Sequence, residues 1–317
     1  MKVAILDDYQ GVALVSADWS RLPEGTEVRV FREHLEDEAV VAEALRPFDV
    51  VVAMRERTPF PASLLARLHN LRLLVTTGMR NAAIDLEDCA RRGVTVCGTG
   101  AVGAPAAELT WALILALLKR VPTEDRALRE GRWQTGLTEG LTGKRLGVVG
   151  LGKLGTQVAR VGLAFGMEVL AWSPNLTEER AREAGVRLAT KNELFSTADI
   201  VTLHLVLGDR TRGVAGLAEL RAMNRTAYLI NTSRAGLVDE DALLAVLREG
   251  HIAGAGLDVF SVEPLPSSHP LLSLPNTVLT PHLGYVTREN YAVYYRDAVE
   301  DILAWSQGKP LRRLAGP

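Results

Sequence analysis

The stretch from Gly147 to Trp172, GVVGLGKLGTQVARVGLAFGMEVLAW, decides the fold. It opens with an apolar, strand-like run, turns at Gly150, Gly152 and Gly155 in the pattern G-x-G-x-x-G, and continues with apolar residues at helical spacing. In such a unit the first glycine permits a tight turn, the second lets a pyrophosphate approach the backbone, and the third lets the helix lie close to the strand. The N-terminus of the helix then attracts phosphate through its N–H groups and dipole. The stretch therefore predicts a dinucleotide-binding loop.

Two other interpretations of this loop exist. The segment GVVGLGK, from Gly147 to Lys153, also fits G-x-x-x-x-G-K, the start of a nucleoside triphosphate loop. That loop needs Ser or Thr at the next position to hold magnesium, and this chain has Leu154 there. The second alternative is a glycine-rich turn without any ligand, which the flanking strand and helix patterns make less favoured.

The residues after the second strand bear on the type of dinucleotide. A site that prefers NAD usually carries Asp or Glu there, which binds the ribose hydroxyls and repels a 2′-phosphate. This chain has Ser173, Pro174 and Asn175 at that point, and Arg180 lies further on in a helical pattern. Because the repelling carboxylate is absent, the sequence predicts NAD or NADP, with NADP permitted.

The rest of the chain alternates β-rich runs with helical stretches, a pattern typical of parallel sheets wound on both faces. The first part contains expected strands at 2–6, 27–31, 49–54, 71–76 and 94–98 and helical patterns at 40–45 and 61–68. After a glycine-rich passage at 97–105 and a long helix, the strand pattern restarts at 144–150, 167–172, 199–205, 227–231, 253–260 and 277–282. Asp239 is the expected N-cap of a helix at 239–250, and a last amphipathic helix at 288–305 is expected to pack on the first part. The expected fold is α/β with two doubly wound parallel sheets.

The bulk properties narrow the class of protein. A length of 317 residues favours two domains. A net charge of −2 gives no reason to expect a nucleic-acid or membrane partner. Cys89 and Cys97 match no metal or redox spacing, and the longest apolar run, Leu109 to Leu118, is too short to cross a bilayer. The N-terminus lacks the apolar stretch of a secretion signal, so we expect a cytoplasmic protein without a metal.

Three ionisable residues follow three successive strands of the second part. They are Arg234, Glu263 and His282. The carboxyl ends of parallel strands face one edge of a sheet, where ligands bind. Histidine exchanges protons near neutral pH, a carboxylate orients its ring, and an arginine fork binds a carboxylate. The three predict hydride and proton chemistry on a small 2-hydroxy or 2-oxo acid, although each alone fits a structural role. The other histidines considered are expected at the surface: His34, His69, His251 and His269.

Five motifs occur in a fixed order: GLGKLG, LHLVLGDRTRGVAG, LINTSRAGLVDEDAL, GAGLDVFSVEPLP and LPNTVLTPHLGY. With them the chain resembles the D-isomer-specific 2-hydroxyacid dehydrogenases, a family that includes phosphoglycerate dehydrogenases and glyoxylate/hydroxypyruvate reductases. The resemblance implies an NAD(P)-dependent enzyme that interconverts a 2-oxo acid and a D-2-hydroxy acid. Its catalytic set would be Arg234, Glu263 and His282, with His282 as the acid and base.

The resemblance also implies the domain arrangement. A Rossmann cofactor domain would span 100–284, and a smaller, discontinuous, flavodoxin-like substrate domain would comprise 1–99 and 285–317, with a cleft between them. Relatives of this kind are usually homodimers joined through the cofactor domains. The helix at Leu109 to Leu118 and the segment around Trp133 fit such an interface.

Further site residues are implied in the same way. Asp258 would lie near the nicotinamide carboxamide, and the backbone of a substrate loop at Gly78, Met79 and Arg80 would take the substrate carboxylate. Arg80 replaces the second glycine of the commoner Gly-x-Gly, and it would either close this loop or contact an acidic substrate. Arg55 would face the cleft or solvent. The remaining implied cofactor-binding residues are Thr110, Lys153, Leu154, Leu205, Thr232 and Gly284.

Two other functions compete with this expectation. A nicotinamide-sensing regulatory protein could use the same fold, because a fold does not determine a function. A formate-oxidising branch of the family carries Gln as the partner of the histidine, and Glu263 argues against it.

Overall fold

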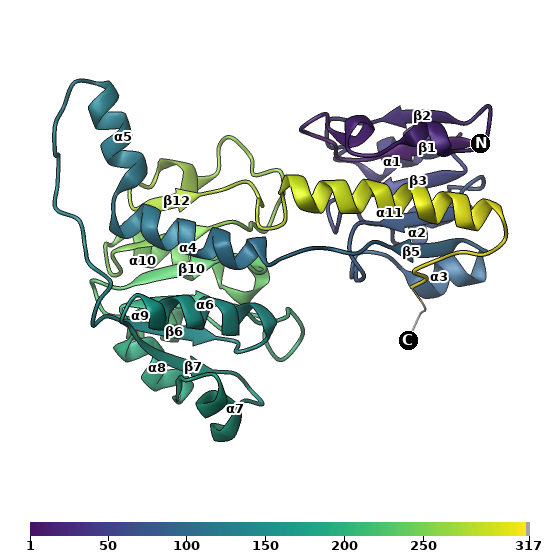
Figure 1. Cartoon of the computed structure of the whole chain (residues 1–317). Helices are drawn as coiled ribbons and strands as arrows, with labels where there is room; N and C mark the ends of the chain where they lie inside the picture. The colour runs from purple at the N-terminus through teal and green to yellow at the C-terminus, as the bar shows by residue number, and fades with distance from the viewer. Residues whose placement is uncertain (315–317) are drawn as a thin grey trace. The chain divides into compact units, whose positions relative to one another are not determined.

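The computed structural model describes residues 1–314, which form two compact units (Figure 1). Unit 1 comprises residues 1–103 and the chain from Thr287 onward, and unit 2 comprises Ala104–Val286. Both boundaries lie a few residues beyond the expected positions at 99 and 284. Each unit contains one parallel sheet with helices, which confirms the expected fold class. None of the helices within residues 1–314 is both long and apolar enough to span a membrane.

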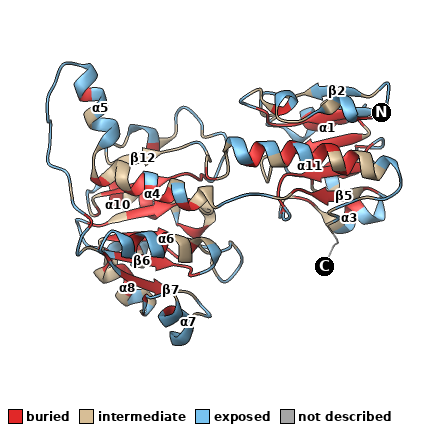
Figure 2. Ribbon diagram, viewed as in Figure 1, coloured by how far each residue is buried: buried red, intermediate tan, exposed pale blue. Residues whose placement is uncertain are grey.

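Unit 1 is built on a five-stranded parallel sheet in the order β2-β1-β3-β4-β5. The strands are β1 (Lys2–Ile5), β2 (Glu27–Val30), β3 (Val50–Ala53), β4 (Leu73–Thr76) and β5 (Thr95–Gly98). Every residue of β3 and β4 is buried, as expected for parallel strands covered on both faces (Figure 2). The helices of the unit are α1 (Glu38–Leu45), α2 (Ala62–Leu65), α3 (Leu86–Arg91), α11 (Arg288–Ser306) and two short 3-10 helices at Ala13–Val15 and Trp19–Arg21. Helix α3 has no counterpart among the expected elements.

Helix α11 packs within unit 1. The ring of Tyr295 lies 6.2 Å from the ring of Trp19, and the Asp297 carboxylate accepts a hydrogen bond of 2.8 Å from the Gly100 N–H. The chain then returns along β5, where the Gly98 N–H donates to the Arg312 carbonyl at 2.9 Å. The C-terminal part of the described chain is thus bound to both the helix and the sheet.

Unit 2 is built on a seven-stranded parallel sheet in the order β12-β11-β10-β9-β6-β7-β8. Its strands are β6 (Arg145–Val149), β7 (Glu168–Trp172), β8 (Arg187–Leu188), β9 (Ile200–Leu203), β10 (Tyr228–Asn231), β11 (Gly254–Leu257) and β12 (Thr277–Leu279). The order reverses at β6, which has β7 on one side and β9 on the other. Such a switch point is where ligands bind in open α/β sheets. Only the short β8 was not expected from the sequence.

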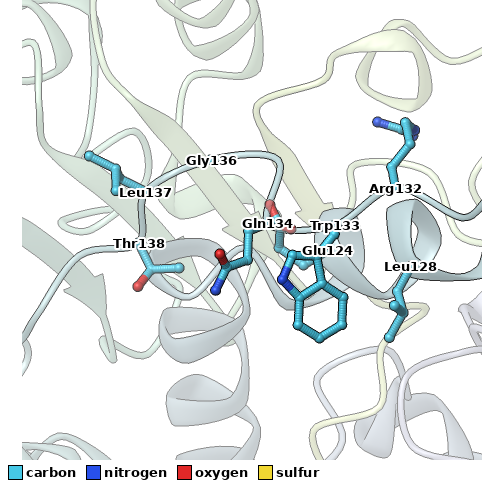
Figure 3. A pocket seen from close by; sticks show the side chains of 8 residues that line it. All are labelled: Glu124, Leu128, Arg132, Trp133, Gln134, Gly136, Leu137 and Thr138. Atoms are coloured by element: carbon cyan, nitrogen blue, oxygen red, sulfur yellow. The ribbon is translucent and has the colours of Figure 1, made fainter.

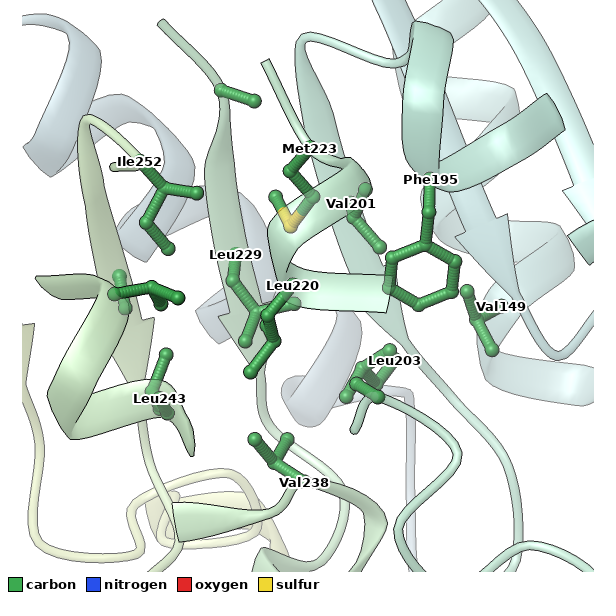
Figure 4. Close-up of a cluster of buried hydrophobic side chains, with 14 of the residues drawn as sticks. Val149, Phe195, Val201, Leu203, Leu220, Met223, Leu229, Val238, Leu243 and Ile252 are labelled. Atoms are coloured by element: carbon green, nitrogen blue, oxygen red, sulfur yellow. The ribbon is translucent and has the colours of Figure 1, made fainter. Parts of the chain in front are cut away.

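The helices of unit 2 supply two buried clusters. They are α4 (Pro105–Leu118), α5 (Val121–Arg129), α6 (Lys153–Ala164), α7 (Glu178–Glu183), α8 (Lys191–Thr197), α9 (Leu217–Ala222), α10 (Glu240–Arg248) and 3-10 helices at Ala235–Leu237 and Pro270–Ser273. Phe195, Leu220 and Leu243, from α8, α9 and α10, pack in one cluster with Leu229 of β10 (Figure 4). A second cluster contains side chains of α4 and α6. The carboxylate of Asp239 accepts a 3.0 Å hydrogen bond from the Ala242 N–H, which confirms the expected cap of α10.

Candidate active site

His282 and Glu263 form a direct hydrogen bond. Nδ1 of His282 lies 2.6 Å from Oε2 of Glu263, and the other carboxylate oxygen, Oε1, accepts a 2.9 Å hydrogen bond from the Phe260 N–H. Because an ionised carboxylate only accepts hydrogen bonds, this contact places a hydrogen on Nδ1. Nε2 is then the ring nitrogen left for a reacting group.

Asp258 anchors the loop that carries His282. Its buried carboxylate accepts hydrogen bonds from the Thr280 hydroxyl at 2.7 Å, the Leu283 N–H at 2.7 Å and the Gly284 N–H at 2.9 Å. Burial raises the pKa of Asp258, and these three donors oppose that shift. The anchored residues lie on both sides of His282, whose φ of 52° is in the left-handed region. The recorded hydrogen bonds of Asp258 therefore fix the position of the histidine.

The segment after β10 is braced in a similar way. The Asn231 side chain donates to the Arg234 carbonyl at 2.9 Å and accepts from the Ser233 N–H at 3.1 Å. The half-buried Arg234 side chain donates from Nη1 to the Ser233 carbonyl at 2.7 Å. Since β10, β11 and β12 are neighbours in the sheet, Arg234, Glu263 and His282 follow adjacent strands at one edge.

The glycine-rich loop fits a pyrophosphate. Gly150 has a φ of 106°, and a Cβ at Gly155 would lie only 1.9 Å from the Gly150 carbonyl oxygen. Gly152 precedes the first residue of α6, and a Cβ there would meet nothing within 4 Å. Gly155 is thus required by helix packing, whereas Gly152 leaves open space next to the helix N-terminus.

A cavity of about 330 Å³ lies at this loop. Its volume is at the lower end of the range of roughly 300–1,000 Å³ for small-molecule sites. It is lined by Gly150, Leu151, Gly152, Ser173, Pro174, Asn175, Leu176, Arg180, His204, Leu205, Val206, Arg210 and Thr211. The cavity thus brings together five of the expected cofactor residues: Gly150, Gly152, Ser173, Asn175 and Leu205. The other expected cofactor residues do not line it: Thr110, Lys153, Leu154, Gly155, Thr232, Asp258 and Gly284.

Thr110 and Thr232 are nevertheless in direct contact. Both are buried, and their hydroxyl oxygens lie 2.7 Å apart. Because the Thr110 hydroxyl donates to the Ala106 carbonyl at 2.8 Å, the Thr232 hydroxyl is the donor between them. This contact connects α4 to the segment after β10.

The histidines differ from the sequence-based expectation. His204, which was not considered, lines the cavity, and burial lowers its pKa to about 4, so its ring is neutral. Its position at a strand end, in DIVTLHL, was the available signal. His34 and His269 are not surface residues, since their side chains are 14% and 15% exposed. Each is half-buried against a carboxylate, at 3.1 Å from Asp7 and 3.2 Å from Glu240.

The expected substrate loop lies in unit 1, after β4. The Gly78 N–H donates to the Thr99 hydroxyl at 2.8 Å, so a substrate carboxylate would have to replace this hydrogen bond. Within residues 1–314 no hydrogen bond from the Met79 or Arg80 N–H is recorded, and the Arg80 side chain is exposed. These two N–H groups are the ones that remain for a ligand.

Arg55 lies against this loop. Its own N–H donates to the Thr77 hydroxyl at 3.0 Å, and its carbonyl accepts from the Asn81 side chain at 2.6 Å. Gly78 has a φ of 88°, which favours glycine, and a Cβ there would lie 2.0 Å from Nη1 of Arg55, so a larger residue would displace the guanidinium. The guanidinium of Arg55 thus lies against Gly78, the residue before Met79, and its Nε is 3.8 Å from Oε2 of Glu56.

Comparison with known proteins shows the family of the chain. The family model described as "D-isomer specific 2-hydroxyacid dehydrogenase, NAD binding domain" matches residues 111–284. The chain belongs to the D-isomer specific 2-hydroxyacid dehydrogenase family. It is 40% identical to the glyoxylate reductase of Aeropyrum pernix over 78% of this chain and 76% of that protein. It is 35% identical to the glyoxylate reductase of Korarchaeum cryptofilum over 85% of this chain and 83% of that protein.

A solved structure shows the same fold over nearly the whole length of both chains. The phosphoglycerate oxidoreductase of Vibrio cholerae is 41% identical, with a TM-score of 0.92 over 97% of this chain and 99% of that one. As a member of this family, the protein is a nicotinamide-dependent oxidoreductase that acts on 2-hydroxy acids. None of these comparisons supports a nicotinamide-sensing regulator.

Proposed function

We propose that this family member reduces a 2-oxo acid to a D-2-hydroxy acid, and catalyses the reverse reaction, with His282 as the acid and base. The observation that carries the proposal is the hydrogen bond between His282 and Glu263. It holds Nδ1 and leaves Nε2 for the oxygen of the substrate. The particular 2-oxo acid is left open, because the relatives act on several.

The nicotinamide cofactor, when bound, donates the hydride in reduction and accepts it in oxidation. Nε2 of His282 gives its proton to the substrate carbonyl oxygen as that oxygen becomes a hydroxyl, and it takes the proton back in the reverse direction. Glu263 stabilises the imidazolium form and fixes the ring. Arg234 binds the substrate carboxylate and stabilises the negative charge that develops on the carbonyl oxygen.

The proposed cofactor is NAD or NADP. The open space at Gly152 and the N-terminus of α6 suit its pyrophosphate, and the cavity lined by Ser173, Asn175 and Leu205 suits its adenosine part. The other proposed cofactor contacts are Thr110, Gly150, Lys153, Leu154, Gly155, Thr232, Asp258 and Gly284. For the substrate we propose the Met79 and Arg80 N–H groups together with Arg55, since those groups offer donors and positive charge. A cytoplasmic location stays a prediction.

We also propose a homodimer through unit 2, with the segment from α5 to Thr138 as the contact. Trp133 is 75% exposed and Leu137 is 95% exposed. Figure 3 shows both among the side chains of this segment. These side chains line an open hollow of about 700 Å³ formed only by α5 and the loop after it. A second copy of the same segment is the occupant that would cover these two apolar side chains. The other expected interface element, Leu109 to Leu118, contributes less, because its side chains at Trp111, Leu113, Ile114 and Leu118 are buried in the core of unit 2.

Sedimentation of the purified protein tests the dimer. The wild type is expected to sediment with twice the mass of one chain. The double variant Trp133→Ser, Leu137→Ser is expected to sediment as a monomer or to associate much more weakly. The exposed Leu272→Ser, elsewhere in unit 2, serves as the control. A monomeric wild type at tens of micromolar would contradict the proposal.

The reaction is tested by following absorbance at 340 nm. NADH and NADPH would each be combined with glyoxylate, hydroxypyruvate, pyruvate, phenylpyruvate and the dicarboxylate 2-oxoglutarate. Oxidation with at least one acid is expected, and His282→Gln should lower kcat at least about 100-fold because glutamine cannot exchange the proton. The exposed His69→Gln is the matched control. Full turnover by His282→Gln would remove His282 from the mechanism, and cofactor binding without turnover on any acid would contradict the proposed function.

A further inference from the structure

We propose that this enzyme selects NADPH over NADH, and that Arg180 and Arg210 bind the 2′-phosphate. The inference rests on the proposed function, because it assigns selectivity within the proposed cofactor site. It goes further than the sequence did, since the sequence only permitted NADP. The family description names NAD alone.

The residue that follows β7 lacks the carboxylate that is typical of an NAD-selective site. This strand ends at Trp172, and Ser173 takes the next position, where an NAD-selective site has a carboxylate. The Ser173 hydroxyl oxygen accepts a 3.1 Å hydrogen bond from the Leu151 N–H, so the residue is fixed against the glycine-rich loop. Ser173 thus provides neither the negative charge that repels a 2′-phosphate nor the paired acceptors that hold the ribose diol of NAD.

Two arginines converge on the same cavity. Arg180 stands in the first turn of α7, whose cap Thr177 accepts a 3.3 Å hydrogen bond from the Arg180 N–H. Arg210 comes from the loop after β9, where the Thr211 hydroxyl donates to the Val206 carbonyl at 2.7 Å. Two segments that are distant in sequence therefore each bring one arginine to the cavity that contains Ser173.

The residues that line the cavity carry a net positive charge. Within residues 1–314 neither Arg180 nor Arg210 has a recorded ion pair, and no residue that lines the cavity is Asp or Glu. His204 is neutral, since burial lowers its pKa to about 4. Two positive charges without a compensating carboxylate favour a phosphate monoester, which carries between one and two negative charges near neutral pH. Arginine is suited to this task because its planar fork can donate two hydrogen bonds to one phosphate.

Calorimetric titration with two cofactor fragments tests the inference without the reaction. The compounds 2′,5′-ADP and 5′-AMP share the adenosine and the 5′-phosphate and differ only in the 2′-phosphate. We expect 2′,5′-ADP to bind at least about 10-fold more tightly at low salt. The advantage should shrink as salt is added, because both arginines are exposed and their charges are screened.

Variants assign the effect to the two side chains. Arg180→Ala and Arg210→Ala should each weaken 2′,5′-ADP binding about 10-fold and leave 5′-AMP binding within about 2-fold. Arg182→Ala, in the same helix, and Arg212→Ala, in the same loop, are matched controls because neither residue lines the cavity. In steady-state assays kcat/KM for NADPH should fall with Arg180→Ala and Arg210→Ala, whereas kcat/KM for NADH should not.

The outcomes separate this inference from the proposed function. Equal binding of the two fragments, or no effect of either arginine variant on 2′,5′-ADP, overturns the inference. The proposed function would then still stand if NADH were oxidised with a 2-oxo acid. If the protein binds neither NADH nor NADPH, the proposed cofactor site fails and the inference fails with it.

Discussion

The Glu263 carboxylate bridges His282 and the backbone of Phe260, because Oε2 lies 2.6 Å from His282 Nδ1 and Oε1 accepts the Phe260 N–H at 2.9 Å. A backbone donor thus fixes the carboxylate, and the carboxylate fixes the ring. Glu263→Gln keeps the shape but removes the charge that stabilises an imidazolium. We expect kcat to fall roughly 10- to 100-fold while cofactor binding is unchanged. Steady-state kinetics and fluorescence titration of NADPH measure the two quantities.

A second His–Glu pair in the same unit provides the control for this variant. Glu240 Oε1 lies 3.2 Å from His269 Nε2, and neither residue belongs to the proposed site. Glu240→Gln should therefore leave kcat close to that of the wild type. Equal losses of kcat in the two glutamine variants would mean that the effect of Glu263→Gln is only structural.

Asp258→Asn tests the anchor of the histidine loop. An asparagine would direct an NH₂ group at one of the backbone N–H groups of Leu283 and Gly284, which now donate to the carboxylate. Leaving a buried donor unsatisfied costs about 1–3 kcal/mol, so the melting temperature and kcat should both fall. Asp241→Asn, on the exposed face of α10, should change neither. A fully stable and active Asp258→Asn would show that the loop does not depend on this carboxylate.

Replacement by alanine is expected to have different effects at Gly155 and at Gly152. In Gly155→Ala the new Cβ would lie 1.9 Å from the Gly150 carbonyl oxygen, so the loop must shift, and we expect a large loss of stability, about 3 kcal/mol or more. In Gly152→Ala the Cβ meets nothing within 4 Å, so stability should change by less than about 1 kcal/mol. The added methyl should nevertheless weaken dinucleotide binding, because it occupies the space proposed for the pyrophosphate. Thermal unfolding with NADPH titration distinguishes the two, and unchanged binding by Gly152→Ala would contradict that placement.

The sequence predicted most of the fold because strand and helix patterns are local. The G-x-G-x-x-G spacing between two β-rich runs indicated the loop before β7, and the parallel order placed Arg234, Glu263 and His282 at one sheet edge. The direct bond between Glu263 and His282 was foreseen for the same reason. Short elements such as β8 and α3 were missed, because two to six residues carry too little periodicity.

The sequence did not predict the contacts between side chains that are far apart along the chain. Arg180 lies several residues after Ser173 in the sequence, and Arg210 lies in a loop that has no helical or strand periodicity. Both nevertheless line one cavity. The donor from Gly78 to Thr99 depends on the neighbouring positions of β4 and β5, which no local pattern specifies. The half-buried positions of His34 and His269 could not be predicted either, because their partner carboxylates, Asp7 and Glu240, lie far away in the sequence.

Asp301 predicts a pH dependence of stability in unit 1. It is fully buried on α11, and burial raises its pKa to about 7, although Arg312 Nε donates to its Oδ1 at 3.1 Å. Its other facing groups are Asp297 and Glu300, which also favour the protonated form. Since the folded pKa exceeds the unfolded one, the contribution of this group is complete below about pH 4 and is lost as the pH rises to about 7.

Asp301→Asn should remove that contribution. The difference in the free energy of unfolding between variant and wild type should change between pH 4 and 7 and stay constant above, with a total change below about 4 kcal/mol. The exposed Asp209→Asn should show no such change. A pH-independent difference for Asp301→Asn would mean that the carboxyl group is ionised throughout this range.

The exposed positive charge of Arg80 leads us to expect a preference for substrates with a second negative charge. Its side chain is exposed and has no recorded ion pair within residues 1–314, and its own N–H is proposed to bind the substrate carboxylate. A free cation at this position favours a second anionic group on the substrate over a role in closing the loop. We therefore expect higher kcat/KM for 2-oxoglutarate than for 2-oxopentanoate, which has the same chain length. Arg80→Gln should lower kcat/KM for the dicarboxylate roughly 10-fold and leave the monocarboxylate unchanged.

Arg67→Gln, an exposed arginine on the segment after α2, is the control for the general loss of a positive charge. If Arg80→Gln lowers kcat/KM equally for both acids, the side chain acts by closing the loop instead. If the variant affects neither acid, Arg80 contributes only its backbone. Because the two acids differ only in the terminal charge, the ratio of their kcat/KM values isolates the contact with that charge from any change in cofactor binding.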